Sequence, residues 1–395
     1  MQVTELTAFL VPLPLKREIK HASFTRTESI NLLIRCKLAN GTIGWGEGVP
    51  RPYVTGETPE GCLQQLSRSN LQPALTRPAS SWPDVISICD ELEFHNEADD
   101  PRGCGSNSLR CAVELSLLDA FGKHFGQPVR EVVPHVAEAS EIHLKQPGVR
   151  YSTTITSSGA KSERISALKM RAYGFAQCKI KVGVDGQDDP SRVARIRRWI
   201  GGGVDLRLDA NEAWRPEEVI EKMRPLREFG VTCIEQPVAH DEVDALASLR
   251  ESIGVPIMLD ESLTSRMDAK RAIEWGTCDL FNLRLSKCGG FLSCLRLAAF
   301  ARASGLGYQL GCHPGESGVL SAAGRHWASS VRDIRYLEGS YDRHLLTTLP
   351  TQEDITFRYG GWAPALDSPG LGVTIREDWL RQNAKAERAF VIDAQ

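Results

Sequence analysis

The sequence predicts an α/β protein in which a (β/α)8 TIM-type barrel lies beside a smaller α+β domain. Two observations carry this prediction. From about residue 150, short β-rich runs alternate with amphipathic helical segments, which is typical of βα units around a parallel sheet. Polar residues also recur at the ends of these runs, with separations of 28, 26, 25 and 27 residues between Lys181, Asp209, Glu235, Asp260 and Lys287.

The N-terminal 125 or so residues predict an antiparallel sheet followed by helices. Residues 31–38 form an apolar-rich run, Asn40-Gly41 is a strong hairpin signal, and residues 42–46 return as a second strand. Apolar residues then recur with helical spacing over 60–71 and 108–125. These segments together predict the small α+β domain.

Two details of this region are also predictable. In the helix over 108–125, we expect Asp119 and Lys123 to face away from a buried stripe formed by Leu115, Leu118, Phe121 and Phe125. The glycines at 44, 46 and 48 lack the spacing of a dinucleotide-binding loop, and no helix begins after them. A nucleotide site is therefore not expected there.

Eight strand candidates follow, each separated from the next by a helical segment. They cover residues 151–156, 178–182, 205–209, 233–235, 256–260, 280–285, 307–311 and 334–337. Prolines near 190 and 216 suit the first turns of two of the helices. Extending the polar period reaches Thr153 upstream and His313 and Glu338 downstream. Eight polar positions at eight strand ends are expected at the C-terminal mouth of a barrel.

Composition and charge exclude several classes of protein. With 47 Lys and Arg against 50 Asp and Glu, the net charge of −3 provides no broad basic surface for nucleic acid or a membrane. No run approaches the roughly 18 apolar residues of a membrane span, and no secretory signal is expected. The 11 cysteines, an odd number without a Cys-x-x-Cys pair, argue against a disulfide framework or structural zinc and favour a reduced, cytoplasmic protein.

Three carboxylates, those of Asp209, Glu235 and Asp260, end consecutive predicted strands and should converge at the barrel mouth. Unpaired carboxylates in one cavity repel each other, so a divalent cation is favoured among them. Oxygen ligands indicate a hard metal, Mg²⁺ first and Mn²⁺ second. Taken singly, each carboxylate is better explained as a helix N-cap or an arginine partner. The three in register, without obvious cationic partners, favour the metal.

Lys179 and Lys181 lie two residues apart on one predicted strand and therefore point to the same side, the barrel interior. Near a metal and near one another, their pKa values should fall, which would leave one lysine able to act as a base. Lys287 ends the sixth strand, across the barrel. Lysines on opposite sides of a metal-bound substrate suit proton abstraction next to a carboxylate. The alternative, a surface pair on an edge strand, is disfavoured by the apolar neighbours Ile180 and Val182.

Five segments carry a family resemblance: Lys179-Ile-Lys181, Asp-Ala-Asn-Glu-Ala-Trp at 209–214, Ile-Glu-Gln-Pro at 234–237, Leu-Asp-Glu-Ser at 259–262 and Ser-Lys-Cys-Gly-Gly at 286–290. Through them the chain resembles the muconate lactonizing enzyme subgroup of the enolase superfamily. This subgroup contains muconate cycloisomerases, dipeptide epimerases, acylamino-acid racemases and o-succinylbenzoate synthase. Segments 44–47 and 110–114 resemble its capping domain, so the match covers nearly the whole chain.

The resemblance implies a domain organisation. An α+β capping domain would comprise residues 1–130, the barrel 131–345, and a C-terminal segment, 346–395, would return to the capping domain over the barrel mouth.

The resemblance also implies roles for individual residues. Lys181 and Lys287 would be the acid/base pair, and Lys179 would support Lys181 electrostatically. Asn211 and Glu261 would support the metal ligands. The shared chemistry of the subgroup is proton abstraction next to a carboxylate, with the enediolate stabilised by metal.

Three departures from the subgroup's pattern bear on the substrate. Arg284 stands where related sequences commonly carry lysine, and the segment from His313 to Glu316 should change a substrate-facing loop. The eighth strand ends at Glu338 and lacks the Asp-x-Asp with which dipeptide epimerases hold a substrate ammonium. We take Arg284, His313, Glu316 and Glu338 as candidate substrate contacts. They favour a dicarboxylate or an N-acylated amino acid over an ordinary dipeptide.

These substrate contacts have alternatives. His313 is equally well explained as a loop residue bonded to backbone, and Glu338 as the partner of Arg335 or Arg343. A cationic loop of the capping domain could hold a second substrate carboxylate, although a solvated charge run explains the same residues. The loop residues are Lys16, Arg17, His21, Ser23 and Arg26.

The leading interpretation is a metal-dependent isomerase that acts on a small-molecule carboxylate, by cycloisomerisation or by racemisation or epimerisation. A lyase, a dehydratase similar to o-succinylbenzoate synthase, is the runner-up. A dipeptide epimerase and a non-catalytic metal-binding barrel are further alternatives, the last disfavoured because every polar position that the chemistry requires is filled. No nucleic-acid or membrane partner is expected, and a homo-oligomer is compatible with the sequence.

Overall fold

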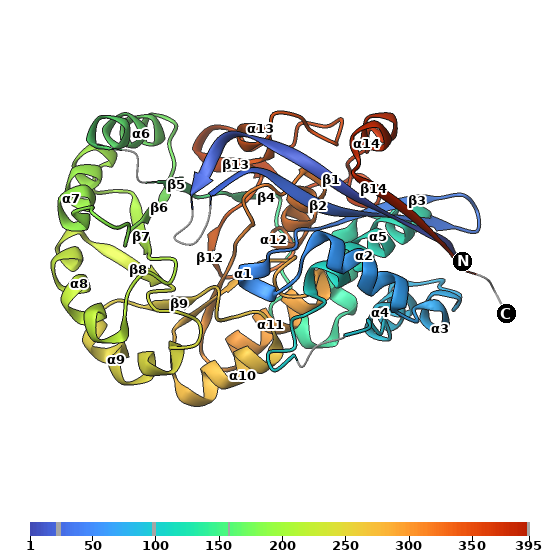
Figure 1. Cartoon of the computed structure of the whole chain (residues 1–395), viewed down its shortest axis with the longest axis horizontal. Coiled ribbons are helices and arrows are strands. Elements are labelled where there is room, and N and C mark those ends of the chain that lie inside the picture. The colour runs from blue at the N-terminus through green and yellow to red at the C-terminus, as the bar shows by residue number, and fades with distance from the viewer. Residues whose placement is uncertain (21–24, 97–99, 157–158, 393–395) are drawn as a thin grey trace.

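The computed structural model describes residues 1–20, 25–96, 100–156 and 159–392. A barrel, on the left in Figure 1, lies against a domain in which a long antiparallel sheet packs on helices. Within the described ranges, no helix is both long enough and apolar enough to span a membrane.

Eight parallel strands form one curled sheet in the order β12-β11-β10-β9-β8-β7-β6-β5. Their bounds are β5 Thr153–Ile155, β6 Gln177–Lys181, β7 Asp205–Asp209, β8 Val231–Glu235, β9 Ile257–Leu259, β10 Leu280–Leu283, β11 Gly307–Leu310 and β12 Ile334–Leu337. The Ser152 N–H, just before β5, donates to the Leu337 carbonyl at 2.8 Å, so the first and last strands meet. All eight predicted strands are confirmed, to within two residues at each end.

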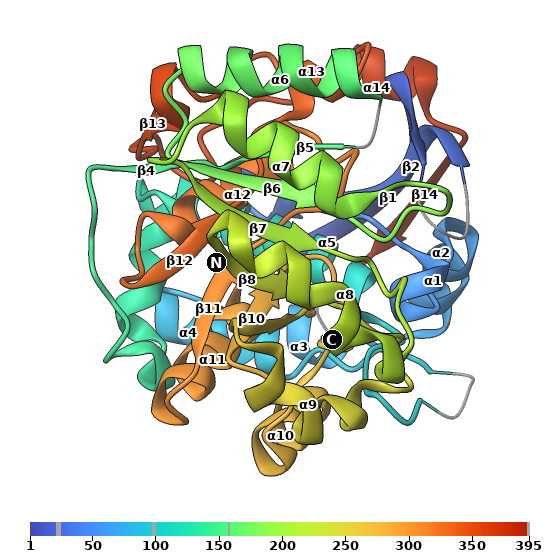
Figure 2. The same cartoon turned by 90° about the vertical axis from the view of Figure 1, so that its left-hand side faces the viewer.

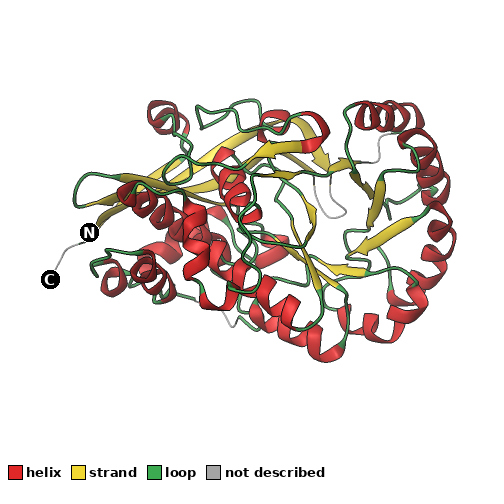
Figure 3. Cartoon of the chain, turned by 180° about the vertical axis from the view of Figure 1, so that it is seen from behind, coloured by secondary structure: helices red, strands yellow, loops and turns green. Residues whose placement is uncertain are grey.

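Helices follow the strands and form the outer layer of the barrel, as Figures 2 and 3 show. They are α6 Ala160–Ala172, α7 Asp189–Ile200, α8 Val219–Leu226, α9 Leu246–Ile253, α10 Arg266–Trp275, α11 Phe291–Ala303, α12 Gly318–Ala328 and α13 Asp342–Leu345. Polar side chains cap several of them: Asp188 accepts from the Ser191 N–H at 3.1 Å, and Ser265 accepts from the Met267 N–H at 3.1 Å. The predicted (β/α)8 order is thereby confirmed.

The second sheet is antiparallel and has the order β14-β1-β2-β3. Its strands are β1 Val3–Lys20, β2 Thr25–Leu38, β3 Ile43–Gly48 and β14 Ala386–Val391. The predicted hairpin joins β2 and β3. The last strand pairs with the first, with Glu5 opposite Val391, so the chain returns from the barrel to this sheet. The exact domain boundaries at residues 130 and 345 stay predictions.

The remaining elements surround this sheet or close the barrel. They are α1 Pro52–Thr55, α2 Pro59–Arg68, α3 Gln72–Leu75, α4 Trp82–Asp90, α5 Asn107–Phe125, the strand pair β4 Gly148–Arg150 and β13 Trp362–Pro364, and α14 Glu377–Asn383.

Strand β1 was not predicted, because Pro12 and Pro14 interrupt its apolar run. The register explains why the prolines are tolerated. β14 pairs only with residues Glu5 to Leu10 of β1, so Pro12 and Pro14 lie where β1 has β2 as its one sheet partner. A proline that lacks an N–H costs little at such an edge.

The glycines at every second position of β3 allow this strand to pack closely against α5. A Cβ atom added at Gly44, Gly46 or Gly48 would lie less than 3.0 Å from backbone atoms of α5. The strand therefore lies directly against the helix backbone, which only glycine at every second position permits.

The predicted orientation of Asp119 on α5 is wrong. Its side chain is buried, and its carboxylate accepts hydrogen bonds from the Trp45 N–H at 2.8 Å and the Leu371 N–H at 2.7 Å. Lys123 adds an ion pair at 2.7 Å. Helical periodicity could not show this, because the donors come from β3 and from the C-terminal part of the chain.

Glu114, also on α5, holds the start of α11 and makes stability depend on pH. Its buried Oε1 accepts from the Phe291 N–H at 2.6 Å and the Leu292 N–H at 3.1 Å. Burial raises the pKa of Glu114 to about 7.

Folding therefore favours protonated Glu114, and its contribution to stability is lost as pH rises from the unfolded pKa toward the folded pKa. We expect the free energy of unfolding of wild type, relative to Glu114→Gln, to fall by about 2 to 3 kcal/mol between pH 4.5 and 8. Urea unfolding of both proteins across this range checks it. A difference that does not change with pH would contradict the prediction.

Candidate active site

The predicted polar residues lie at the C-terminal ends of adjacent barrel strands. Lys181 ends β6 opposite Asp209 of β7, and Asp209 lies opposite Glu235 of β8. Asp260 directly follows β9. The three carboxylates are almost completely buried. The side chains that the regular spacing placed at strand ends therefore lie at one end of the barrel.

Lys179 lies among the carboxylates as a permanent cation. Its Nζ is 2.8 Å from Glu338 Oε1, 3.2 Å from Asp209 Oδ2 and 3.3 Å from Glu235 Oε2. Burial alone would lower the pKa of Lys179, but these three carboxylates raise it well above its usual value. With these neighbours Lys179 is suited to hold charge, and the fall of its pKa beside a bound metal stays a prediction.

The carboxylates of Asp209, Glu235 and Asp260 follow one another along three neighbouring strands, and we call them the carboxylate row. Lys181 and Lys287 lie at its opposite ends. Lys181 donates to Asn211 Oδ1, and its Nζ is 3.7 Å from Asp209, the first carboxylate. Lys287 Nζ is 2.8 Å from Asp260 Oδ1, the last carboxylate. Since β8 lies between β7 and β9, Glu235 separates the two lysines. Two amines at opposite ends of such a row are the arrangement that proton transfer on both faces of a substrate carbon requires.

The two lysines differ in surroundings. The Lys287 side chain is fully buried, and its Nζ also donates to the Asp260 carbonyl at 2.7 Å and the Asn282 carbonyl at 2.8 Å. Three acceptors match the three N–H bonds of a lysine ammonium, so the side chain is fixed in place. The Lys181 side chain is 30% exposed and is the more accessible of the two.

Arg284 contacts the carboxylate row directly. Its buried guanidinium donates to Asp260 Oδ2 and lies 3.9 Å from Glu235 Oε1. The prediction that the carboxylates lack cationic partners is therefore wrong: Lys179, Arg284 and Lys287 all pair with them, because interior positions of neighbouring strands face one another. Within the described ranges, no three His, Cys, Asp or Glu side chains converge on one point as metal ligands do.

The donor set nevertheless fits a hard divalent cation. Glu261 Oε2 is a buried oxygen that accepts no hydrogen bond in the described part of the chain, and Asp209 Oδ2 has only the lysine ion pairs at 3.2 and 3.7 Å. Burial, and then the Asp209 carboxylate, raise the pKa of Glu235 to about 8, and burial with Asp260 raises that of Glu261 to about 8. Burial is the largest cause of both shifts, and a divalent cation among these oxygens would favour their charged forms. Oxygen-only ligands suit Mg²⁺.

A family comparison agrees with this arrangement. Residues 163–379, more than half of the chain, match the family model described as "Enolase C-terminal domain-like". The chain belongs to the enolase superfamily.

Relatives within the superfamily cover almost the full length. The chain is 29% identical to N-succinyl-L-Arg/Lys racemase of Bacillus cereus over 389 residues, which cover 97% of this chain and 98% of the racemase. The crystal structure of that racemase has a TM-score of 0.86 and 25% identity, over 99% of this chain and all of that one.

Two further relatives define the range of chemistry. A dipeptide epimerase from Cytophaga hutchinsonii, solved with Mg and the dipeptide D-Ala-L-Val, has a TM-score of 0.83 and 25% identity over the full length of both chains. Muconate cycloisomerase 1 of Rhodococcus opacus is 27% identical over 96% of this chain and 98% of its own. Racemases, epimerases and cycloisomerases are all isomerases, and this protein is an isomerase of the enolase superfamily.

In this superfamily member, Glu338 is held by two cations. Its Oε1 is 2.8 Å from Lys179 Nζ and 2.5 Å from a guanidinium nitrogen of Arg207. Burial alone would raise the pKa of Glu338, but these cations lower it well below its usual range. The alternative prediction, in which Glu338 pairs with Arg335 or Arg343, is wrong. Arg335 pairs with Asp205, and Arg343 pairs with Asp354.

Arg207 is the site residue that sequence reasoning missed. It lies in β7 two residues before Asp209, so its side chain shares the barrel interior. It is completely buried, and it also donates to Ser152 Oγ at 3.1 Å. The available signal was an arginine between two leucines on a predicted barrel strand.

His313 and Glu316 lie together in the loop after β11. The His313 N–H donates to Glu316 Oε1 at 2.6 Å, while the buried Nδ1 of the ring has no partner in the described part of the chain. Burial, with Arg284 and further cations, lowers the pKa of His313 well below its usual value, so the ring is neutral. Burial raises the pKa of Glu316 to about 8.

The capping sheet holds this loop in place. Glu47 of β3 accepts from the Ser317 N–H at 2.9 Å, from Ser317 Oγ at 2.7 Å and from the Leu320 N–H at 3.0 Å. Asn31 of β2 donates to the Gly315 carbonyl at 2.8 Å. Residues nearly 300 positions apart therefore form one wall beside the barrel mouth.

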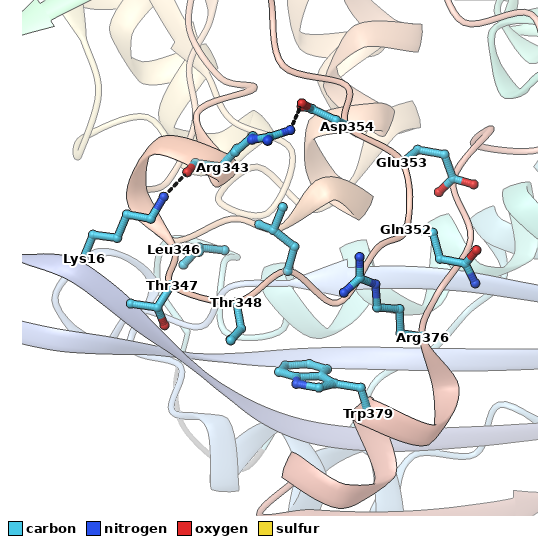
Figure 4. Close-up of a pocket in the computed structure, with 11 residues that line it drawn as sticks. Lys16, Arg343, Leu346, Thr347, Thr348, Gln352, Glu353, Asp354, Arg376 and Trp379 are labelled. Carbon is cyan, nitrogen blue, oxygen red and sulfur yellow. Dashed lines mark hydrogen bonds and ion pairs between the residues drawn. The ribbon is translucent and has the colours of Figure 1, made fainter.

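The cationic N-terminal segment does not act as one unit. Lys16 lines a cavity of about 550 Å³ between β1, α13 and α14 and donates to the Arg343 carbonyl, as Figure 4 shows. The carboxylates and lysines of the barrel mouth are not among its lining residues. His21 and Ser23 lie outside the described residues. Arg26, in contrast, lies close enough to His313 to lower its pKa.

Proposed function

We propose that this isomerase is an Mg²⁺-dependent racemase or epimerase of N-acylated amino acids. The observation that carries the proposal is the placement of Lys181 and Lys287 at opposite flanks of the buried carboxylate row. Asp209, Glu235 and Asp260 are the proposed metal ligands, with Asn211 and Glu261 in support. A divalent cation held there supplies Lewis-acid stabilisation of the charge that develops on a substrate carboxylate. The Mg in the related epimerase structure supports this choice, and Mn²⁺ is the proposed substitute.

The chain's own residues then move the proton. Lys181 Nζ takes the α-proton on one face, and Lys287 Nζ delivers a proton on the other; the reverse direction exchanges the two roles. Lys179 remains charged between Asp209, Glu235 and Glu338 and stabilises negative charge nearby. Asn211, which bonds both Lys181 and Glu261, positions the first lysine.

The eighth strand favours an N-acylated substrate over a dipeptide. A free ammonium would meet Glu338, whose oxygen already binds Lys179 and Arg207. Leaving a buried cation half-compensated costs on the order of 3 kcal/mol, or about 100-fold in kcat/KM. The similarity to a racemase of N-succinyl amino acids points in the same direction.

A substrate screen in D2O tests the proposal. With Mg²⁺ present, N-succinyl and N-acetyl amino acids should take up deuterium at the α-carbon at least about 100-fold more efficiently than matched dipeptides. Muconates, read by lactone formation, and hydroxy acids, read by water loss, test the cycloisomerase and lyase alternatives. Efficient epimerisation of free dipeptides, with acylated compounds inert, would overturn the proposal.

The cysteines support a cytoplasmic location. All eleven are free thiols, and ten of them are buried. Free buried thiols are typical of reducing compartments. A homo-oligomeric state, and the lack of nucleic-acid and membrane partners, stay predictions.

A further inference from the structure

Arg51, between β3 and α1, is a buried cation without a carboxylate partner in the described part of the chain. It is only 5% exposed. Its guanidinium donates to the Pro50 carbonyl at 2.9 Å, to Ser29 Oγ at 2.7 Å and to the Pro314 carbonyl at 3.2 Å. Within the described residues its Nε–H finds no acceptor, the Tyr53 side chain is a further hydrogen-bond partner, and no Asp or Glu forms an ion pair with Arg51. A buried charge that only neutral oxygens compensate is costly to the fold.

The surroundings of Arg51 make this part of the site more positive. Pro314 follows His313, and the pKa of the His313 ring is lowered by burial and then by Arg284, Arg51, Lys287 and Arg26. Cations from the cap and from the barrel therefore gather around one neutral imidazole. Arg284 and Lys287 have Asp260 as partner, whereas Arg51 has no carboxylate counterion among the residues that the structure describes.

The neighbouring acid Glu316 does not supply a counterion. Glu316 acts on Arg51 electrostatically, but its Oε1 accepts from the His313 backbone, and it is not within ion-pair distance of Arg51. Burial, and then Arg26, lower the pKa of Arg51 to about 9, in keeping with a site that lacks a fixed anion. His313, the residue before Pro314, adds a second polar atom, its buried Nδ1, that has no partner within the described ranges.

We propose that Arg51 is a specificity-determining residue that binds a second carboxylate, carried by the acyl group of the substrate. The inference rests on the proposed function and adds to it: the α-carboxylate lies at the Asp209, Glu235 and Asp260 end, and the distal carboxylate lies on the Lys287 side, toward the cap. A guanidinium matches a carboxylate with two parallel hydrogen bonds, so a dicarboxylic acyl group such as succinyl is preferred over acetyl.

A purely structural role is the competing explanation, because Arg51 also joins the cap to the loop after β11. The two roles differ in one respect. If Arg51 only holds the loop, its loss weakens all ligands alike. If it binds the distal carboxylate, its loss weakens only ligands that carry one.

Calorimetry of the Mg²⁺-loaded protein separates them, with N-succinylglycine and N-acetylglycine as probes. We expect wild type to bind N-succinylglycine about 30-fold more tightly. In Arg51→Met this preference should fall to within about twofold, with N-acetylglycine affinity unchanged. Arg51→Lys should retain part of the preference. Ser29→Ala, which removes one structural contact of Arg51, should lower the thermal midpoint while keeping the preference.

Three results would overturn the inference: no preference for N-succinylglycine in wild type, a preference that survives in Arg51→Met, or an equal loss for both probes. Deuterium uptake by N-succinylglycine, followed by NMR, reports separately on the proposed reaction. Arg51-dependent binding without uptake would refute the racemase proposal and leave the Arg51 assignment supported.

Discussion

Replacing Lys181 or Lys287 by alanine should lower racemisation by about 1,000-fold or more, because each change removes one of the two positioned proton-transfer groups. The two variants should differ in stereochemistry. Each should still exchange the α-proton of the enantiomer that faces the remaining lysine, since only one face loses its base. NMR in D2O with separate enantiomers measures this directly.

Stability separates chemical from structural effects in these variants. Lys287 is fully buried and satisfies Asp260 and Asn282, so Lys287→Ala should also lower the thermal midpoint more than Lys181→Ala. Lys287→Met retains most of the volume and isolates the loss of the amine. Lys222→Ala on the exposed face of α8 is the matched control and should retain full activity. Near-normal exchange in both lysine variants would refute the acid/base assignment.

Removing one acid from the carboxylate row should weaken Mg²⁺ binding by about 100-fold or more. The variants are Asp209→Asn, Glu235→Gln and Asp260→Asn, and each replaces an anionic oxygen ligand by a neutral one. Calorimetry on EDTA-stripped protein measures the affinity, and EDTA treatment of wild type should abolish proton exchange until Mg²⁺ is restored. Affinity that is unchanged in Glu235→Gln and Asp260→Asn would contradict the ligand set.

Glu212→Gln provides a control from the same part of the barrel mouth. Glu212 lies next to Asn211, but its Oε1 accepts from His240 at 2.8 Å and is not in the carboxylate row. Its Mg²⁺ affinity should match wild type. Because Lys179, Arg284 and Lys287 lose a partner when a row carboxylate is neutralised, thermal midpoints should be measured alongside, so that loss of metal affinity is not confused with unfolding.

Sequence reasoning was strongest where a local repeat mirrors the geometry. The alternation of β-rich runs and helical segments predicted the strands. Because each βα unit returns the chain to the same end of the barrel, the nearly constant spacing from Lys181 to Lys287 then predicted where the polar side chains meet. A barrel strand also presents alternate residues to its interior, and the pairs Lys179 with Lys181 and Arg207 with Asp209 follow this rule, although the arginine was overlooked.

Local patterns failed where packing against a distant segment overrides them. Pro12 and Pro14 concealed β1, because the sequence does not show that β14 stops short of them. Asp119 was placed on the exposed side of α5, because its backbone donors, Trp45 and Leu371, are distant in sequence.

By itself, the sequence determined the barrel, its strand ends, the polar residues that meet there and the family. Only the tertiary structure decided which charges pair. Glu338 with Arg207, Asp260 with Arg284, and Arg51 with the Pro314 carbonyl each join residues more than 20 positions apart. Periodicity assigns a side chain to one side of a strand or helix, whereas its partner depends on how whole elements pack and on how burial strengthens the interaction of the charges that meet.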